Sequence, residues 1–256
     1  MIDAHTHMDL RPIEDFELMA NAGIGVVVTC SFYLGASSSH TLLDHYNQLI
    51  DIYVIRAKEN GVKLYVAVGI HPYGIPRDYE EVLKTLSDYL EHEDVVAVGE
   101  IGVDSGSKLE FEVFKKQLEI ARDQNIPAVI HTPLRNRGEL FAKCLETIRE
   151  VETDPQLLVI DHADEDIVDE ILVLGSTPGL TIREKQPSTG RITQEKAASL
   201  IKCYGPVFTL NSDINNVFPA DPLSVAKMVH HLRQSGFSDE EIEILSDRKA
   251  REVLKL

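Results

Sequence analysis

Short apolar runs alternate along the chain with longer segments in which apolar residues recur every three or four positions. Residues 24–29 (IGVVVT) form a near-continuous apolar run of strand length, which is typical of a parallel strand covered on both faces. Residues 40–60 follow it with helical spacing. The apolar face of that predicted helix is formed by Leu42, Leu43, Tyr46, Leu49, Ile50 and Tyr53.

The same alternation continues to the C-terminus. It predicts further strands at residues 2–7, 63–68, 95–100, 127–131, 157–161, 180–182 and 206–210. It predicts further helices at residues 78–90, 108–125, 135–150, 166–174, 193–203, 221–235 and 238–256. Residues 183–191 form a polar loop, and Ser238 with Glu241 makes a capping box at the start of the last helix.

Eight strand–helix pairs in 256 residues predict an α/β fold, and specifically a (β/α)8 TIM barrel. The active site of such a barrel lies at the carboxyl-terminal ends of the strands. A doubly wound open sheet is the alternative. Residues 1–256 are interpreted as a single domain, because no linker-like or repeated segment divides them.

Histidines and acids fall at the predicted strand ends. His5 and His7 share one face of the first strand, roughly 6–7 Å apart at the usual rise per residue, so that one divalent ion fits between them. The other strand-end candidates are His71, Glu100, His131, His162 and Asp213.

Imidazoles and carboxylates without thiolates are typical of a catalytic divalent site. Glu100 directly follows a buried strand, and a buried carboxylate needs a cation or hydrogen bonds. The number of candidate ligands suits two ions about 3.5–4 Å apart, bridged by Glu100. Asp213 alone is less informative, because Asn-Ser-Asp is also common in turns.

The net charge of −17 and pI near 4.9 argue against stable binding of long duplex nucleic acid by a broad basic face. Neither a phosphate-binding G-x-x-x-x-G-K-[ST] loop nor a G-x-S-x-G elbow occurs in the sequence. The widely spaced cysteines and the lack of a long apolar run predict a cytoplasmic protein without a membrane span. The sequence leaves open whether the chain forms a homo-oligomer.

These motifs resemble a known family. Asp3-Ala4-His5-Thr6-His7 in the first strand, Gly69-Ile70-His71-Pro72, Gly99-Glu100-Ile101-Gly102-Val103-Asp104, Val129-Ile130-His131, His162 and Ser212-Asp213 are together similar to the TatD-related metal-dependent hydrolases of the amidohydrolase superfamily. That family includes deoxyribonucleases. The resemblance implies the metal ligands His5, His7, Glu100, His131, His162 and Asp213, with Asp213 also accepting the proton of the attacking water.

The sequence departs from the family pattern in three places. Tyr73 stands where a second histidine commonly follows the third-strand His-Pro, and Asn211 stands where the family usually has glutamate. The arginine that follows the fifth-strand histidine is displaced to Arg135 or Arg137. These departures affect the substrate prediction more than the metal prediction.

The predicted function is a phosphoesterase or deoxyribonuclease that uses a metal-activated water, with Glu100 and Asp213 as catalytic residues and one or two Zn²⁺, Mg²⁺ or Mn²⁺ ions. The predicted substrate is a phosphate ester or a short nucleic-acid end. Its predicted contacts are His71, Tyr73, Arg183, Lys185 and Arg191. Hydrolysis of a C–N or C–O bond in a small molecule is the alternative, followed by a catalytically silent metal-binding barrel.

Overall fold

A parallel sheet forms the centre of the protein. The computed structural model describes residues 1–9, 11–219 and 221–256. Its strands are β1 (Ile2–Thr6), β2 (Val26–Cys30), β3 (Lys63–Val68), β4 (Val95–Gly102), β5 (Ala128–His131), β6 (Leu158–Ile160), β7 (Thr177–Ile182), β8 (Arg191–Ile192) and β9 (Thr209–Asn211). Strands β1 to β7 pair in chain order, and β7 also pairs with β8 and β9. Every one of these described pairings is parallel.

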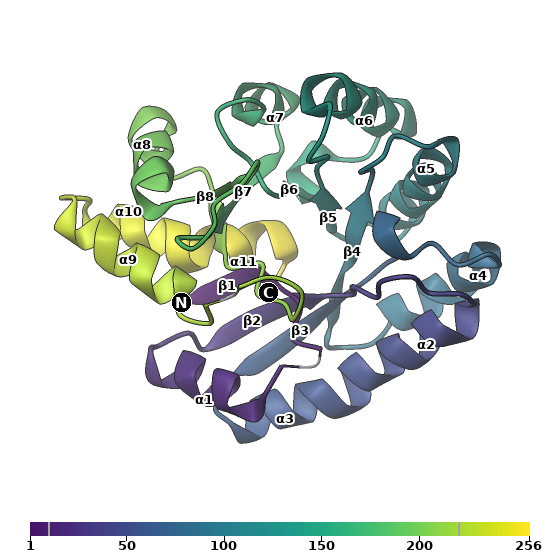
Figure 1. Ribbon diagram of the computed structural model, residues 1–256, viewed down its shortest axis with the longest axis horizontal. Coiled ribbons are helices and arrows are strands. Elements are labelled where there is room, and N and C mark those ends of the chain that lie inside the picture. Colours follow the sequence, from purple (N-terminus) through teal and green to yellow (C-terminus); the bar gives the residue numbers. More distant parts are fainter. Residues whose placement is uncertain (10, 220) are drawn as a thin grey trace.

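The sheet curls until its first and last strands meet. The amide of Asp213, just past β9, donates to the carbonyl of His5 in β1 at 3.0 Å. The amide of His7 donates to the carbonyl of Ile214 at 2.7 Å. Main-chain hydrogen bonds thus join β1 and the residue after it to the segment that follows β9, which gives the sheet a barrel-like shape (Figure 1).

Helices surround the curled sheet (Figure 1). The α-helices are α1 (Ile13–Asn21), α2 (Ser39–Gln48), α3 (Val54–Glu59), α4 (Tyr79–Leu90), α5 (Lys108–Asp123), α6 (Arg137–Val151), α7 (Val168–Leu174), α8 (Gln194–Tyr204), α9 (Ser224–Gln234), α10 (Asp239–Glu243) and α11 (Lys249–Leu254). Shorter helical segments are η1 (Leu49–Tyr53), η2 (Pro72–Gly74), η3 (Pro155–Leu157) and η4 (Ile244–Arg248). In the described part of the chain, no helix has the length and apolarity needed to cross a membrane.

Side-chain alternation along the strands divides the core into two layers. Val27 of β2 belongs to the large cluster between the sheet and the helices. Its neighbour Val28 belongs to a smaller cluster together with Ala67, Ala97 and Val129 of the next strands. Val253 and Leu254 of α11 pack into that smaller cluster. The C-terminal helix therefore covers one end of the strands.

The predicted parallel α/β pattern is confirmed, with local differences. Helix α1 was not predicted, and the helix predicted at 40–60 is divided into α2, η1 and α3. Strand β7 begins three residues earlier than predicted, at Thr177. The eighth predicted strand at 206–210 is observed as β9, and β8 forms at the end of the predicted polar loop. The capping box of Ser238 and Glu241 is confirmed.

A buried side chain from α5 holds the segment that follows β3. The Oε1 atom of Gln117 accepts from the amide of Ile70 at 2.6 Å, and its Nε2 atom donates to the carbonyl of Ile70 at 3.2 Å. Gln117 is fully buried. It satisfies both main-chain groups of Ile70, which would otherwise be buried without partners. The next residue is His71, so this contact also places a candidate site residue.

We expect Gln117→Leu to lower the free energy of unfolding by about 2–4 kcal/mol, because each buried main-chain group left unsatisfied costs about 1–3 kcal/mol. Urea denaturation of the metal-free protein measures the change. Gln48→Leu is the control, because Gln48 is exposed on α2, and we expect it to change stability by less than about 0.5 kcal/mol. Equal stability of the two variants would contradict the role given to Gln117.

Candidate metal centre

The carboxylate of Glu100 lies at the centre of the predicted site. Glu100 is near the end of β4 and is almost completely buried. The chain passes very close to β5 at Gly102, where φ is +150° and a Cβ would lie 2.5 Å from the carbonyl oxygen of His131. Only glycine permits this approach. It brings the ends of β4 and β5 together, so that Glu100 and His131 meet.

One group of ligand atoms faces the Oε2 atom of Glu100. The Nε2 atom of His5 lies 3.3 Å from it, and the Nε2 atom of His7 lies 3.4 Å from it. These two nitrogens are 3.2 Å from each other. The Oδ1 atom of Asp213 is 3.3 Å from the same His7 nitrogen. His5, His7, Asp213 and Glu100 thus converge on one small volume.

A second group faces the Oε1 atom of Glu100. The Nδ1 atom of His131 lies 3.0 Å from it, and the Nε2 atom of His162 lies 3.2 Å from it. His162 follows β6 with a φ of +58°, and Asp213 follows β9 with a φ of +47°. Few non-glycine residues adopt this left-handed conformation. All six predicted metal ligands are therefore brought together, and Glu100 lies between the two groups.

The ring nitrogens of His7 show why a cation is needed here. The Nδ1 atom of His7 lies 2.9 Å from the carbonyl oxygen of Cys30, which can only accept, so that Nδ1 carries a proton. The Nε2 atom of a neutral His7 is then a bare lone pair that points at His5 and at two carboxylates. Lone pairs and carboxylates at these distances repel one another unless protons or a metal ion lie among them. The donor set therefore fits a divalent ion.

His71 lies beside this cluster in a different role. Its Nδ1 atom accepts a hydrogen bond from the amide of Tyr73 at 3.1 Å, so that a neutral His71 carries its proton on Nε2. That Nε2 atom lies 3.4 Å from the Oε2 atom of Glu100. His71 and Glu100 also come close to His131, with ligand atoms within 4.8 Å of one another. The protonated Nε2 nevertheless makes His71 a donor to Glu100 and a poor metal ligand.

The pKa values of the clustered side chains are set by their burial and by the charges of their neighbours. Burial lowers the pKa of His7, but Asp213 and Glu100 outweigh it and raise the pKa to about 9. Burial raises the pKa of Glu100, but His5, His131 and His71 lower it well below its ordinary range. Burial lowers the pKa of His71 to about 4 against the attraction of Glu100. The metal-free cluster thus retains protons where a metal ion would bring positive charge.

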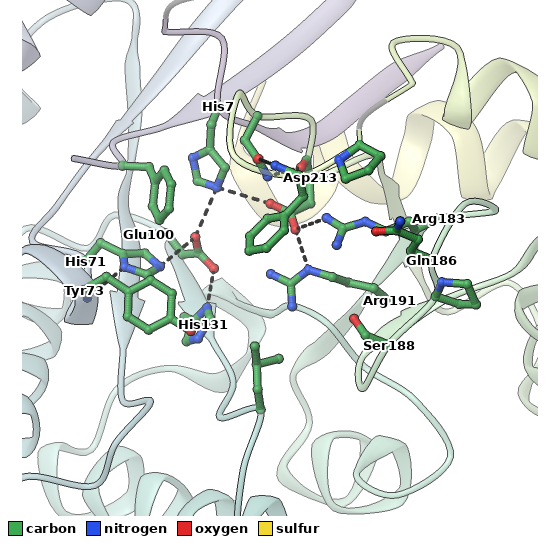
Figure 2. Close-up of a pocket in the computed structure, with 16 residues that line it drawn as sticks. His7, His71, Tyr73, Glu100, His131, Arg183, Gln186, Ser188, Arg191 and Asp213 are labelled. Carbon is green, nitrogen blue, oxygen red and sulfur yellow. Dashed lines mark hydrogen bonds and ion pairs between the residues drawn. The ribbon is translucent and has the colours of Figure 1, made fainter. Parts of the chain in front are cut away.

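Two arginines from the polar loop face the cluster across a pocket of about 340 Å³ (Figure 2). The Nε atom of Arg191 and an Nη2 atom of Arg183 donate to the Oδ2 atom of Asp213 at 2.7 and 3.1 Å. Tyr73 also lines this pocket. Lys185 is exposed and lines a neighbouring pocket that shares Arg183 with the first. Of the predicted substrate contacts, the structure therefore places Lys185 outside the pocket beside Glu100.

Several residues at this site were not predicted as site residues from the sequence. Phe32 and Phe218 line the pocket, and Asp104 lies 3.5 Å from the Nε2 atom of His131. Buried Asp161, Thr181 and Asn211 lie behind the histidines. Asp161 could have been predicted, because it is an acidic residue at the end of an apolar strand, directly before His162. No local signal indicated the aromatic residues, because they come from loops whose course is set by the whole fold.

A parallel sheet that carries buried imidazoles and carboxylates at its strand ends is typical of metal-dependent hydrolases. The model of the TatD-related DNase family matches residues 2–198 of this chain. The chain belongs to this family of metal-dependent hydrolases.

Individual relatives agree with this assignment. An uncharacterized metal-dependent hydrolase from Methanocaldococcus jannaschii is 37% identical over 243 residues, which cover 94% of each chain. The crystal structure of a TatD-like protein from Archaeoglobus fulgidus is similar with a TM-score of 0.84 and 30% identity, over 100% of both chains. A 3'-5' ssDNA/RNA exonuclease TatD from Pantoea ananatis is 35% identical over 83 residues, which cover 30% of this chain and 31% of that protein.

Metal affinity is expected to rise with pH. The pKa of His7 is about 9 without metal, so that a metal ion must displace a proton at neutral pH. Between about pH 6 and pH 9 the apparent affinity should increase by about tenfold per pH unit for each proton released. Titration with Mn²⁺ or chelator-buffered Zn²⁺ at several pH values measures it. The exposed His230 provides the control His230→Gln, which should show the same slope as the wild type. A metal affinity that does not change with pH would contradict the claim that the metal-free cluster holds a proton that the metal ion displaces.

Proposed function

We propose that this chain is a two-metal phosphoesterase that cleaves phosphodiesters at the ends of short single-stranded nucleic acids. The supporting observation is the pair of guanidinium groups beside the buried histidine and carboxylate cluster. Arg183 and Arg191 line the same pocket as Glu100 and Asp213. Guanidinium groups match the geometry of phosphate oxygens. A substrate with an amide or lactone bond carries no such anionic group, so two guanidinium groups fit it less well.

Arg191 has unused capacity to bind an anion. Only 8% of its surface is exposed, and its Nη1 atom has no hydrogen-bond partner among the described residues. A buried guanidinium nitrogen without a partner is costly. A phosphate oxygen in the pocket would provide that partner. The overall charge of −17 makes this local positive group more distinctive.

The size and walls of the pocket favour the end of a chain over a duplex. Its volume of about 340 Å³ lies at the small end of the range for small-molecule sites. Tyr73 and Phe218 line it with 39% and 50% of their surfaces exposed. Exposed aromatic rings can stack on unpaired bases without selecting a sequence. The exonuclease named among the relatives acts on single-stranded DNA and RNA, which agrees with this proposal.

The two ligand groups define where the metal ions would be held. His5, His7, Asp213 and Glu100 would hold one, and Glu100, His131 and His162 would hold the other. Both ions would then lie at the carboxyl-terminal ends of the strands of the proposed (β/α)8 barrel, which we take to be closed by β1 to β7 and β9. Divalent ions bound there lower the pKa of coordinated water and polarise a substrate oxygen.

The side chains have separate roles in the reaction. Arg183 and Arg191 bind nonbridging phosphate oxygens, and His71 holds Glu100 through its Nε2 proton. Asp213 accepts the proton of the attacking water. In the structure both arginines donate to the Oδ2 atom of Asp213 and weaken it as a base. A bound phosphate would draw the guanidinium groups away from Asp213, and proton transfer would then follow substrate binding.

Metal-stripped protein should regain hydrolysis of bis-p-nitrophenyl phosphate and of labelled single-stranded DNA when Mg²⁺, Mn²⁺ or Zn²⁺ is added. We expect Glu100→Ala to abolish this activity, because it removes the carboxylate shared by both ligand groups. Release of nitrophenol and gel analysis of the DNA measure the two reactions. Circular dichroism serves as the folding control.

Absence of cleavage with any metal, in protein whose metal content shows a filled site, would contradict the phosphoesterase proposal. Activity on amides or lactones instead would support the alternative hydrolase function. Unchanged function in Asp213→Asn, with metal still bound, would support a catalytically silent barrel.

Arg191→Gln should lower kcat/KM for both phosphodiester substrates by about 10–100-fold, because a hydrogen bond to a charged group contributes about 1.5–3 kcal/mol. Steady-state kinetics measure it. The matched control is Arg77→Gln, since Arg77 is exposed and does not belong to the described lining of the pocket. An equal effect of the two substitutions would refute phosphate recognition by Arg191.

A further inference from the structure

Three polar side chains lie behind the histidine cluster, away from the pocket: Asp161 after β6, Thr181 in β7 and Asn211 in β9. Each has a relative exposure of 0%. The described lining of the pocket does not include them, so that direct contact with a substrate does not explain them. Burying three polar groups is unfavourable unless they are fully hydrogen-bonded to one another or to a neighbour.

These side chains form one continuous hydrogen-bond network. The Oδ2 atom of Asp161 lies 2.7 Å from the Nδ1 atom of His5, and its Oδ1 atom accepts from the Nδ2 atom of Asn211 at 2.8 Å. The Oδ1 atom of Asn211 accepts from the Thr181 hydroxyl at 2.8 Å. The Thr181 hydroxyl oxygen lies 2.8 Å from the Nδ1 atom of His162. We name Asp161, Asn211 and Thr181 the Asp161 network.

The direction of each bond follows from Asp161. A carboxylate only accepts, so the amide nitrogen of Asn211 must face Asp161 and its oxygen must face Thr181. The Thr181 hydroxyl donates its only proton to the Oδ1 atom of Asn211, so its oxygen can only accept a hydrogen bond from His162. His162 therefore carries its proton on Nδ1. Its Nε2 lone pair lies 3.2 Å from the Oε1 atom of Glu100 and accepts from the Nη2 atom of Arg191 at 3.3 Å, which favours the same tautomer.

His5 is oriented by the other oxygen of the same carboxylate. Its Nδ1 proton goes to Asp161, which leaves the Nε2 lone pair of His5 facing the Oε2 atom of Glu100 at 3.3 Å. His5 belongs to one proposed ion site and His162 to the other. One buried acid thus sets the tautomer of one ligand in each site.

The backbone of β7 leaves room for this carboxylate. A Cβ added to Gly179 would lie only 1.7 Å from the Oδ1 atom of Asp161. Glycine is needed at residue 179 because there is no room for a side chain, and not because of the backbone conformation, since φ of Gly179 is not positive. Any side chain at residue 179 would displace Asp161.

The geometry points to Asp161 as a positioning residue for both metal ions, acting directly on His5 and through Asn211 and Thr181 on His162. This inference rests on the proposed two-ion site. Groups that hold metal-ligating histidines typically change metal affinity by about 10–100-fold when they are removed. We therefore expect the substitution of each member of the Asp161 network to weaken a different set of metal ions.

Thr181→Val removes only the hydroxyl, and should weaken the ion held by His131 and His162 by about 10–100-fold while the other ion binds as in the wild type. Thr181→Ser keeps the hydroxyl and should restore wild-type affinity. Asp161→Asn should weaken both ions, because it contacts His5 as well. Thr132→Val is the matched control: Thr132 is equally buried, but its hydroxyl donates to the main-chain oxygen of Asp161 at 2.9 Å and takes no part in the network.

The experiment is a Zn²⁺ titration of each full-length variant, followed by calorimetry and by NMR of ¹⁵N-labelled histidines. In metal-free protein the ¹⁵N shifts show which nitrogen of His162 carries the proton, and the signal is assigned by its loss in His162→Asn. Because Arg191 also donates to the Nε2 atom of His162, this comparison is made in the Arg191→Gln background, which removes that second donor. We expect a proton on Nδ1 in Arg191→Gln and in Arg191→Gln with Thr181→Ser, and loss of that preference in Arg191→Gln with Thr181→Val.

The outcomes separate this inference from the proposed function. If Thr181→Val binds both ions as the wild type does, and keeps the His162 proton on Nδ1 in the Arg191→Gln background, the Asp161 network has no positioning role. If the wild type binds fewer than two ions, the two-ion site is wrong. The tautomer in metal-free protein then still decides whether the network orients His162. In the Arg191→Gln background, a proton on Nδ1 that Thr181→Val loses supports it, and any other result overturns it.

Discussion

The site depends on one buried carboxylate that is surrounded by imidazoles. Glu100 has His5 and His7 on one oxygen and His131 and His162 on the other, each within 3.4 Å. So many lone pairs and negative charges can share a buried volume only if positive charge lies among them. Protons provide it in the metal-free protein, which is why the pKa of His7 is raised to about 9. Divalent ions would provide it in the working enzyme.

The fold assembles this cluster by bringing the ends of several strands close together. The predicted ligands lie at or near the carboxyl-terminal ends of β1, β4, β5, β6 and β9. The main-chain hydrogen bonds between β1 and the end of β9 bring Asp213 to His7. Glycines at 102 and 179 remove the side chains that would otherwise keep β4 from β5 and Asp161 from β7. The loop between β7 and α8 adds the arginines on the open side. The proposed metal-binding and anion-binding groups thus come from different parts of the chain, so that substrate preference could vary while the metal site stays the same.

Much of this could be predicted from periodicity and from the positions of the histidines, because strand ends in a parallel sheet meet at one edge. The six candidate ligands were predicted in this way, with the family resemblance giving their roles, and their side chains lie together in the structure. The loops could not be predicted: Lys185 and Arg191 lie in one polar segment, yet only Arg191 turns into the pocket beside Glu100. Asn211 was interpreted as a departure from the family pattern. The structure shows it between Asp161 and Thr181, where a second carboxylate would face that of Asp161.

The most direct test of this account is a crystal structure of the Zn²⁺-loaded protein with anomalous data collected at the zinc edge. The account predicts two anomalous peaks, one on each side of the Glu100 carboxylate, the first among His5, His7 and Asp213 and the second between His131 and His162. A single peak, or peaks that lie away from Glu100, would contradict the claim that this carboxylate is shared between two metal ions.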